Sequence, residues 1–544
     1  MLRSANPGSL GSIGSALASF ALTAFAIGAA WWWLGTPVEV GQSQGAAPKP
    51  YCVSYAPFRG GQNPLVAATR VEAWQIDEDL ALLSKFTGCV RTYSVDDGRD
   101  DVLKSARRYG LKVLHGVWVS NNPAKTRVQI ETAIAYAKAY PDVIAAVVVG
   151  NEVLLRGEMS ALDLMAAIRE VKAHVSMPVT YADVWEFWLR YPDVQNAVDF
   201  VTIHVLPYWE DFPIPASRAA AHVAAIRARV AAVFPSKEIV IGEFGWPSAG
   251  RMREGARPSP SNQARAITET LALAEREKFR VNIIEAFDQP WKRALEGAVG
   301  GYWGIFDRAS GGPKFRFGAA VSDHPDWPIQ ALAGIALAAL TFAGAFASGR
   351  RRGLPVSLWP TIAALAFLPA VLFGSTVATV PVESFSPGSW MRSLAFATIA
   401  AIAPIVCAVA CAAGRAPPAF ATLLARDGKG PDGLDWVVGG TLIALTLVSV
   451  EAALGLVFDP RYRDIPFAPL SAAVIPYLVL RVSTRQAAGS RAMAETAAAA
   501  VCVASAVYIV FNESFANWQA VWFCVGLVGL SFTLAFARRA PSSA

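Results

Sequence analysis

Two glutamates that follow runs of small and β-branched residues are the clearest candidates for chemistry in this chain. Glu152 ends the run Val-Val-Val-Gly-Asn-Glu, and Glu243 ends Ile-Val-Ile-Gly-Glu. Near-continuous apolar runs of this kind are typical of parallel strands that are buried on both faces. Glycoside hydrolysis needs one carboxyl group to protonate the leaving oxygen and a second to attack the sugar or to activate water. Two carboxylates at two strand ends suggest cleavage of a glycosidic bond as a working hypothesis, and the alternative for each is an ordinary solvated glutamate after a strand.

The scaffold must bring these two strand ends together. From residue 51 onwards strand-like and helix-like stretches alternate eight times, which is the rhythm of a (β/α)8 TIM barrel. Glu152 and Glu243 would end the fourth and seventh strands, at the face where barrel enzymes place their reacting groups. A doubly wound open sheet is the alternative, but no glycine-rich phosphate loop follows the first strand. The predicted strands cover residues 51–57, 89–94, 112–119, 143–152, 178–184, 198–208, 238–246 and 281–287.

The rest of the chain is far more apolar than this region. The 544 residues are 54% hydrophobic, which is too much for an ordinary soluble protein. Residues 1–35 are predicted to form a signal anchor, 36–50 a linker, 51–327 the barrel, and 328–544 a helical membrane domain with about seven spans. Signal cleavage near Ala46-Ala47 is the weaker alternative. The run at 465–481 is the least certain span, because it is short and carries Pro469 and Pro476.

Basic residues between the apolar runs predict the orientation in the membrane. The positive-inside rule puts the richer side in the cytoplasm, so both termini are expected there and the barrel outside. This placement of the net charge of +6 argues against nucleic acid as a partner. The short loops on the outer side hold Arg392, Arg461 and Arg463. The inner side holds Arg3, Arg350 to Arg352, Arg415, Arg426, Lys429, Arg481, Arg485, Arg491, Arg538 and Arg539.

Cysteines and intramembrane charges add little to the functional prediction. No His/Cys cluster has zinc spacing, so no metal and no cofactor are predicted. An oxidising compartment would permit a disulfide between Cys52 and Cys89, but we expect cysteines on paired strands to miss bridge geometry.

Glu451 lies inside a predicted span and is therefore a candidate functional residue, although it could reach the outer surface or pair with a hydroxyl. The bundle is interpreted as an anchor or partner surface.

The residues around both glutamates resemble the signature segments of glycoside hydrolase family 17, the β-1,3-glucanase family. Val-Gly-Asn151-Glu152-Val and Gly-Glu243-Phe-Gly-Trp246-Pro-Ser carry most of this resemblance, which covers about residues 51–307. It extends to Val-Ser-Tyr55, Val-Arg91-Thr-Tyr93, Leu-Pro-Tyr208 and Ala-Phe287-Asp. The resemblance implies a retaining barrel enzyme that acts on β-1,3-glucan oligosaccharides or polysaccharide. It also implies that Glu152 is the acid/base and Glu243 the nucleophile.

The chain departs from the plant members of that family in two ways. It has Glu243-Phe where they usually have Glu-Ser, and it carries membrane spans. The second feature resembles bacterial membrane-anchored members involved in building periplasmic or cyclic β-(1,3;1,6)-glucan. That resemblance implies a multi-pass protein of the bacterial inner membrane whose barrel lies in the periplasm. The implied partners are the lipid bilayer and a membrane glucan synthase. The implied reaction is transfer of glucan with formation of β-1,6 linkages. Hydrolysis by an endo-β-1,3-glucanase and a non-catalytic glucan-binding role are the alternatives.

Further candidates for sugar contact are aromatic and polar side chains near the predicted strand ends. Asn151 can donate to a sugar 2-hydroxyl, and Arg91 can pair with Glu243, although a turn residue and a structural ion pair are the respective alternatives. Indole rings at the rim suit stacking on sugars, but some are expected to fill the core. The candidates are Tyr55, Arg91, Tyr93, Asn151, Tyr208, Trp246, Phe287, Trp118, Trp185 and Trp291.

Overall fold

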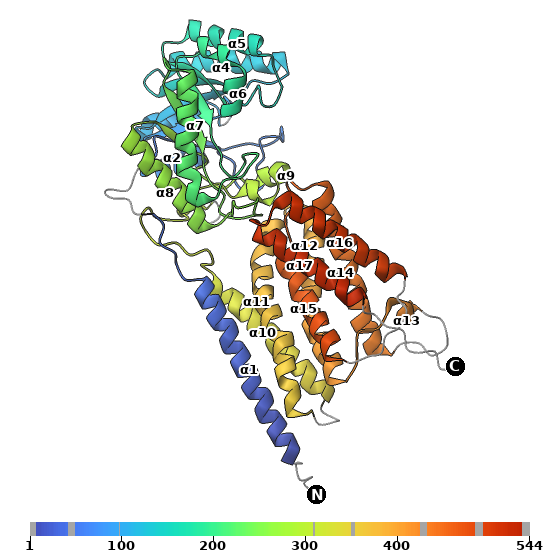
Figure 1. Ribbon diagram of the computed structural model, residues 1–544. Helices are drawn as coiled ribbons and strands as arrows, with labels where there is room; N and C mark the ends of the chain where they lie inside the picture. Colours follow the sequence, from blue (N-terminus) through green and yellow to red (C-terminus); the bar gives the residue numbers. More distant parts are fainter. Residues whose placement is uncertain are drawn as a thin grey trace. The chain divides into compact units, whose positions relative to one another are not determined.

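The computed structural model describes residues 7–41, 49–96, 98–307, 311–349, 354–424, 432–484 and 493–535. The chain divides into two compact units (Figure 1), one formed by residues 37–321 and the other by residues 1–36 with 322–544. Most of the predicted linker, including Ala46 and Ala47, lies outside the described residues.

The first unit is a closed barrel of eight parallel strands that pair in sequence order, with β8 pairing back to β1. This arrangement confirms the predicted (β/α)8 fold. Several strands are shorter than predicted; the sixth ends at His204, because Pro207 has no amide to continue the ladder and the chain turns at Leu206. The strands are β1 (Cys52–Ser54), β2 (Cys89–Arg91), β3 (Lys112–Val117), β4 (Ile144–Asn151), β5 (Val179–Val184), β6 (Val201–His204), β7 (Ile239–Phe244) and β8 (Val281–Ile283).

Helices follow the strands and cover the barrel. Three of them begin at side-chain caps that satisfy a free backbone amide: Asn122 accepts from Lys125, Ser160 from Asp163, and Ser259 from Asn262. The apolar faces of these helices pack on the outside of the strands and form one continuous core with them. The helices are α2 (Ala73–Leu83), α3 (Asp101–Tyr109), α4 (Pro123–Ala139), α5 (Ala161–His174), α6 (Trp185–Arg190), α7 (Ala219–Val233), α8 (Pro260–Glu277) and α9 (Arg293–Glu296).

Cys52 and Cys89 form a disulfide, so the expectation that paired strands would keep them apart is wrong. Val53 pairs with Val90 in the β1–β2 ladder, which sets the two cysteines one step earlier, directly opposite each other. Their Cα atoms are 4.4 Å apart, within the range that a disulfide can bridge. Both side chains are buried at the amino-terminal end of the barrel interior.

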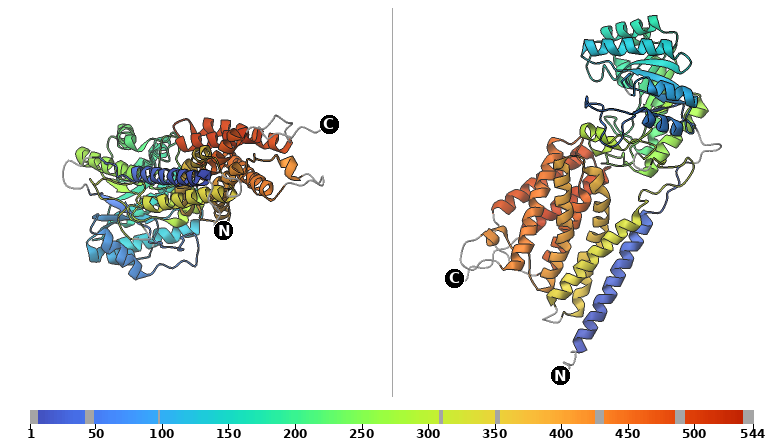
Figure 2. Two further views of the ribbon diagram at one scale, coloured as in Figure 1. Left: turned by 90° about the horizontal axis from the view of Figure 1, so that it is seen from below. Right: turned by 180° about the vertical axis from the view of Figure 1, so that it is seen from behind.

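The second unit is a helical bundle (Figure 2) in which long apolar helices run side by side. In the described part of the chain, seven helices are long and apolar enough to cross a membrane. The predicted fifth run forms α15, which at 17 residues is shorter than the others. The helices are α1 (Pro7–Leu34), α10 (Trp327–Gly349), α11 (Trp359–Glu383), α12 (Pro387–Ala412), α13 (Phe420–Leu424), α14 (Gly433–Phe458), α15 (Phe467–Ser483), α16 (Met493–Glu513) and α17 (Trp518–Ala535).

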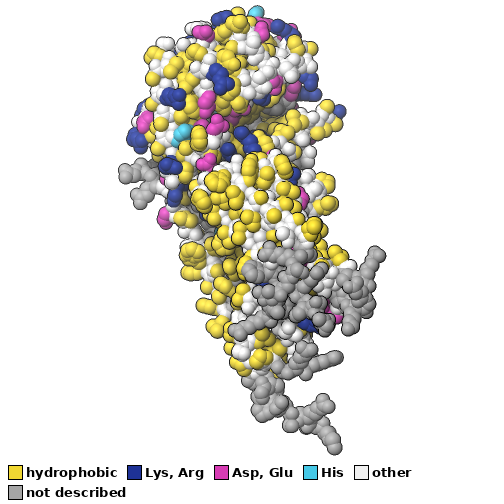
Figure 3. Space-filling view, turned by 45° about the vertical axis from the view of Figure 1, so that its right-hand side comes forward, with side chains coloured by type: hydrophobic (Ala, Val, Ile, Leu, Met, Phe, Trp, Pro, Cys, Tyr) yellow, Lys and Arg dark blue, Asp and Glu magenta, His cyan; other side chains and the backbone are white. Residues whose placement is uncertain are grey.

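Small residues allow the helices of this bundle to approach closely. A Cβ added at Gly334 of α10 would lie 2.6 Å from the carbonyl oxygen of Ala370 in α11, so only glycine permits this crossing. Such contacts are characteristic of helices that pack without a hydrophobic driving force between them. On the face that Figure 3 shows, the described part of these helices carries mostly hydrophobic side chains.

The structure describes only some of the charged residues on which the predicted membrane orientation rests. Glu451 forms an ion pair with Arg463 at 3.3 Å and lies 4.0 Å from Arg392, so arginines are its partners, in place of the hydroxyl considered above. Arg415 pairs with Asp432. Most of the predicted cytoplasmic charges lie outside the described residues: Arg3, Arg350 to Arg352, Arg426, Lys429, Arg485, Arg491, Arg538 and Arg539.

Candidate active site

Glu243 lies in β7 and is almost fully buried, with 4% of its surface exposed. Its Oε1 accepts a hydrogen bond from the Tyr93 hydroxyl at 2.9 Å and one from Arg91 Nη1 at 3.2 Å. Burial and the negative charge of Glu243 raise the pKa of Tyr93 well above its ordinary value, so this hydroxyl stays protonated and remains a donor. Glu243 is therefore held in one position by two donors, with a positive charge beside it.

Arg91 connects the ends of β2, β4 and β7. Besides Glu243, its guanidinium donates to the carbonyl oxygen of Gly242 at 2.7 Å and to Oδ1 of Asn151 at 2.6 Å. The side chain is 1% exposed, so these contacts are made in a region of low dielectric. The planar guanidinium of Arg91 thus fixes Glu243, the candidate nucleophile, relative to Asn151. Asn151 directly precedes Glu152, the candidate acid.

Glu152 follows β4 directly and has a left-handed backbone, with φ of +54°. A residue other than glycine rarely adopts this conformation, which costs about 1–3 kcal/mol and persists where the surrounding structure enforces it. The amide of Glu152 donates to the carbonyl oxygen of Ala182 at 2.8 Å, and this bond holds the turn. The side chain is 22% exposed, much more than the 5% of Glu243.

His204, at the end of β6, lies between the two glutamates. Its Nδ1 is 2.8 Å from Oε1 of Glu152, and its Nε2 is 3.6 Å from Oε1 of Glu243. Burial favours the protonated form of Glu152, but the hydrogen bond and the charge of the His204 ring outweigh burial and lower the pKa of Glu152. Sequence reasoning missed His204, because one histidine in a buried strand gives no signal until β6 is placed between β5 and β7.

The two carboxylates are close together. One oxygen of Glu152, one oxygen of Glu243 and a ring nitrogen of His204 lie within 4.8 Å of one another. Retaining glycosidases hold their two carboxyl groups about 5–5.5 Å apart, whereas inverting enzymes leave about 6.5–9.5 Å for a water molecule. The short distance between these two oxygens therefore fits the retaining arrangement better than the inverting one.

These three side chains offer the ligand types of a metal site, but their surroundings do not fit a cation. Arg91 Nη1 lies 3.2 Å from Glu243 and 3.3 Å from Nε2 of His204. A metal ion bound to the same atoms would be repelled by this buried guanidinium. The charge that balances Glu243 is provided by the protein itself.

A second layer of polar side chains supports Tyr93 and the β7 backbone. Asn282 of β8 donates to the Ser54 hydroxyl at 2.8 Å and to the carbonyl oxygen of Gly242 at 2.7 Å. The Ser54 hydroxyl in turn lies 2.8 Å from the Tyr93 hydroxyl. Ser54 and Asn282 were also missed from the sequence, since a serine and an asparagine in short strands are not distinctive.

Beyond β8, a half-buried lysine compensates two further acidic groups. Lys292 donates to both carboxylate oxygens of Glu285, at 2.9 and 3.0 Å. Burial raises the pKa of Glu285, and it raises the pKa of Glu296 to about 7, where the charges of Glu285, Glu152 and Glu243 add to the effect. Glu296 is therefore close enough to the two central glutamates to share their electrostatic environment.

Four of the predicted sugar contacts are packed inside the barrel. Tyr55, Tyr208, Trp246 and Phe287 are each at most 2% exposed. The Tyr208 hydroxyl donates to the carbonyl oxygen of Arg251 at 2.9 Å, and the Trp246 indole donates to that of Arg257 at 3.0 Å. These rings shape the strand ends and hold the loop after β7, and direct contact with a sugar would require this packing to open.

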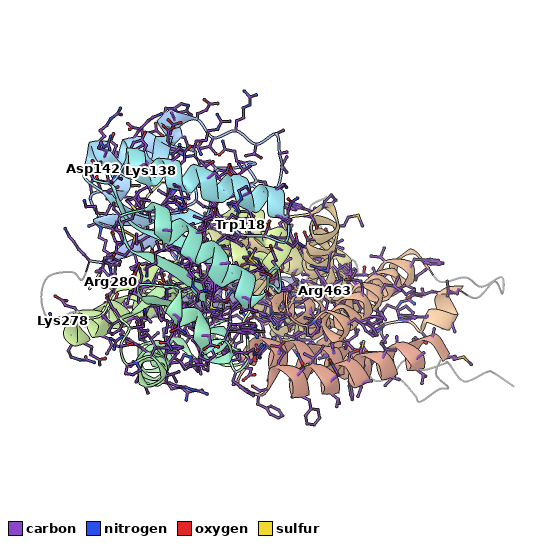
Figure 4. All side chains as sticks on the ribbon, turned by 90° about the horizontal axis from the view of Figure 1, so that it is seen from above. Trp118, Lys138, Asp142, Lys278, Arg280 and Arg463 are labelled. Atoms are coloured by element: carbon purple, nitrogen blue, oxygen red, sulfur yellow. A yellow bond between two sulfur atoms is a disulfide. The ribbon has the colours of Figure 1, made fainter. Side chains whose placement is uncertain are left out.

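The other three tryptophans among the predicted contacts are at least partly accessible. Trp118 is 37% exposed, and the guanidinium of Arg156 lies 4.3 Å from the centre of its ring. Trp118 follows β3, and Figure 4 shows it far from Asp142 and Arg280, which precede β4 and β8 at the amino-terminal end of the barrel. The Trp185 indole donates to Glu210 at 3.3 Å, and that of Trp291 to Gln289 at 2.9 Å.

Comparison with known proteins agrees with this geometry. Residues 52–304 match the family model described as the BtgE/BtgC glycoside hydrolase domain. The barrel is therefore similar to BtgE/BtgC glycoside hydrolase domains. This match confirms the prediction of a glycosidase or transglycosylase enzyme, and it ends before the helical part that follows the barrel.

Curated relatives of the BtgE/BtgC domain come from fungi. The chain is 28% identical over 274 residues to a glucan 1,3-beta-glucosidase of Arthroderma benhamiae, covering 46% of this chain and 86% of the relative. It is 31% identical over 243 residues to a probable beta-glucosidase btgE of Aspergillus flavus, covering 43% of this chain and 39% of that protein. A solved glycoside hydrolase family 17 beta-1,3-glucanosyltransferase from Rhizomucor miehei is 23% identical, with a TM-score of 0.43 over 49% of this chain and 97% of its own.

Proposed function

We propose that this chain is a retaining β-1,3-glucan-active transglycosylase anchored in a membrane. The observation that carries the proposal is the pair of carboxylates, Glu152 and Glu243, with oxygens within 4.8 Å of each other at the ends of β4 and β7. The BtgE/BtgC domain supports the chemistry, and the glucan-active relatives support the substrate class.

The first step forms a covalent intermediate. A carboxylate oxygen of Glu243 attacks the anomeric carbon, and the bond between that carbon and the glycosidic oxygen breaks. Glu152 gives its proton to the leaving oxygen, so one glucan fragment departs as an alcohol. Tyr93 and Arg91 hold the attacking carboxylate in place, and Asn151 is proposed to bind the sugar 2-hydroxyl through its amide.

The protonation of Glu152 depends on burial and on its neighbour His204. Burial favours the protonated form of Glu152, but the hydrogen bond to Nδ1 of His204, at 2.8 Å, lowers the pKa of the carboxyl group. Substrate binding excludes water and strengthens the effect of burial. Glu152 then holds the proton that it gives to the leaving oxygen.

The second step decides between transfer and hydrolysis. An acceptor hydroxyl gives its proton to Glu152 and attacks the anomeric carbon, and Glu243 leaves as a carboxylate. A sugar held by rim aromatics such as Trp118 outcompetes water through positioning alone. The loop after β7 is fixed against the barrel through Arg253, which donates to the carbonyl oxygen of Tyr208 at 2.7 Å, and it offers a preformed wall for the acceptor.

The linkage and the biological setting are also part of the proposal. Attack by an acceptor 6-hydroxyl would produce a β-1,6 linkage, as expected for an enzyme of periplasmic or cyclic β-glucan. The seven long apolar helices support multi-pass anchoring, for which we propose the bacterial inner membrane and a glucan synthase partner. The buried Cys52–Cys89 disulfide supports an oxidising compartment for the barrel, such as the periplasm. Reporter fusions after residue 320 should then be active only outside the cytoplasm, and fusions after Arg352 only inside.

Product analysis tests the reaction. Detergent-solubilised protein is incubated with laminari-oligosaccharides, and the products are followed by mass and linkage. Products longer than the substrate, with new 1,6 linkages, support the transglycosylase. Shorter products alone, even at high substrate concentration, would replace it with an endo-β-1,3-glucanase. Unchanged substrate together with measurable binding would indicate a non-catalytic glucan-binding protein.

A further inference from the structure

The loop that follows β1 borders an open surface hollow whose lining does not include the paired glutamates. The hollow has a volume of about 590 Å³ and is lined by the loop and by the first turn of α2. Trp74 forms part of its wall and is 59% exposed. A single exposed indole is ordinary on a protein surface, but here it faces a depression that Gly60 and Gly61 leave free of side chains.

Hydrogen bonds hold this loop in a defined shape. The side-chain amides of Gln62 and Gln75 bond to each other at 2.9 and 3.2 Å, and Gln62 also donates to the carbonyl oxygen of Arg70 at 2.8 Å. Arg59 donates to Asp79 at 2.6 Å, and its guanidinium lies 5.5 Å from the centre of the Trp74 ring. The hollow is therefore formed before any ligand arrives, which lowers the cost of binding.

The hollow is connected to the catalytic face of the barrel. Asp79 accepts from the Tyr55 hydroxyl at 2.9 Å, and Tyr55 follows β1 directly. Phe58 of the same loop packs edge-on against Trp291, with ring centres 6.4 Å apart. Trp291 belongs to the loop after β8, next to Lys292. The hollow thus adjoins the loops at the carboxyl end of the barrel, where Glu152 and Glu243 lie.

The charges around the hollow select the class of ligand. Among the described lining residues Arg59 carries the positive charge, and two carboxylates, Asp79 and Glu78, pair with it at 2.6 and 3.0 Å. No excess positive charge in this group is available for a phosphate or another anion. The remaining polar lining is uncharged, and the amides of Gln62 and Gln75 already bond to each other and to backbone carbonyl oxygens. The hollow therefore offers a ligand mainly the exposed Trp74 indole, and an indole in uncharged surroundings suits stacking on a neutral sugar ring.

We infer that the Trp74 hollow is a remote subsite that binds a glucose unit of a long β-glucan, beyond the units held at the two glutamates. The inference rests on the proposed function, because it takes glucan as the substrate. A remote subsite uses binding energy from a part of the substrate that does not react, and it favours long chains over short ones.

The test compares long and short ligands on a protein that does not turn them over. Full-length Glu243→Gln protein in detergent is titrated with laminarin and with a short laminari-oligosaccharide by calorimetry. Trp74→Ala is added to this background, and Gly61→Leu is a second variant, because a Cβ at Gly61 meets no atom within 4 Å and the added side chain fills the hollow. Tyr191→Ala is the control, since Tyr191 is 37% exposed at the end of α6.

We expect Trp74→Ala and Gly61→Leu each to weaken laminarin binding about tenfold, the order of one aromatic contact, with the short ligand and the control unchanged. Unchanged laminarin binding in both variants overturns the subsite and leaves the proposed function intact. Equal weakening for both ligands also overturns it, because the effect would then be structural. If the background protein binds neither ligand, and wild-type protein does not convert them, the proposed function itself fails.

Discussion

The assignment of separate roles to Glu152 and Glu243 can be tested by removing each carboxylate and offering a small anion in its place. In Glu152→Ala the first step loses its acid, so attack on glucan should slow by about 10²–10⁴-fold. An aryl β-laminarioside with an acidic phenol needs no proton on its leaving group, so its first step should be nearly unaffected. The intermediate then accumulates, because water has no base to activate it.

Azide should relieve this block and report the stereochemistry. The side chain of Glu152 is 22% exposed, so a small anion can enter the space that alanine leaves. Attack of azide on the glycosyl-Glu243 intermediate gives the β-glycosyl azide, since two inversions restore the original configuration. In Glu243→Ala azide takes the place of the nucleophile, and a single inversion gives the α-glycosyl azide. The loss in Glu243→Ala without azide should be at least as large as that in Glu152→Ala.

Nuclear magnetic resonance of the azide products distinguishes the two anomers. Glu152→Gln and Glu243→Gln are the matched controls, because they keep the side-chain shape while filling the space that azide needs. The role assignment fails if both alanine variants give the same anomer. It also fails if Glu243→Ala keeps wild-type activity on glucan.

Three further predictions concern the groups around this pair. Replacing Cys52 and Cys89 by serine should lower the free energy of unfolding by about 4 kcal/mol, as a cross-link between residues 37 apart implies, and thermal melts with and without reductant should show it. Burial raises the pKa of Asp183 to about 6, so its stabilising protonated form is fully present below about pH 4 and is lost as the pH rises through 6. The wild-type protein should therefore lose about 3 kcal/mol of its free energy of unfolding across that window, and Asp183→Asn, which cannot ionise, should not. A difference in melting temperature between the two proteins that does not change with pH would contradict this. Arg91→Lys keeps the charge but cannot reach both Glu243 and Asn151, and it should lower kcat/KM about 10- to 100-fold with an unchanged circular dichroism spectrum.

The barrel and its paired glutamates were predictable because their signals are local. Strand runs that end in Asn151-Glu152 and in Glu243 are contiguous in the sequence, and the number of β/α units then places them across from each other. The helical part was equally visible, since the length of an apolar run decides whether it can span a membrane. The run that forms α15 was the one whose length left a membrane span in question, and α15, at 17 residues, is shorter than the seven helices that are long enough to cross a membrane.

What could not be predicted depends on contacts between distant residues. His204 reaches Glu152 across 52 positions, and Asn282 reaches Ser54 across 228. The disulfide depends on register: a shift of one residue would have separated Cys52 from Cys89, and no sequence pattern fixes the register of two three-residue strands. Burial was misjudged for aromatic residues in particular. Tyr208 and Trp246 are aromatic residues of the type that stacks on sugar rings, but the loop after β7 covers them.

The difference in exposure between the two glutamates fits the roles that we propose for them. A nucleophile that forms and breaks a bond to carbon exchanges no proton, so Glu243 can be enclosed by Arg91 and Tyr93 with 5% of its side chain exposed. An acid/base must pass a proton to one molecule and take one from another, and the 22% exposure of Glu152 leaves it an open side. In the proposed mechanism the leaving fragment departs and the acceptor arrives on that side, where Arg156 lies against Trp118. The balance between transfer and hydrolysis therefore depends on how well the surface around Glu152 holds a sugar, and variants of Trp118 should alter the ratio of long to short products more than the rate of cleavage.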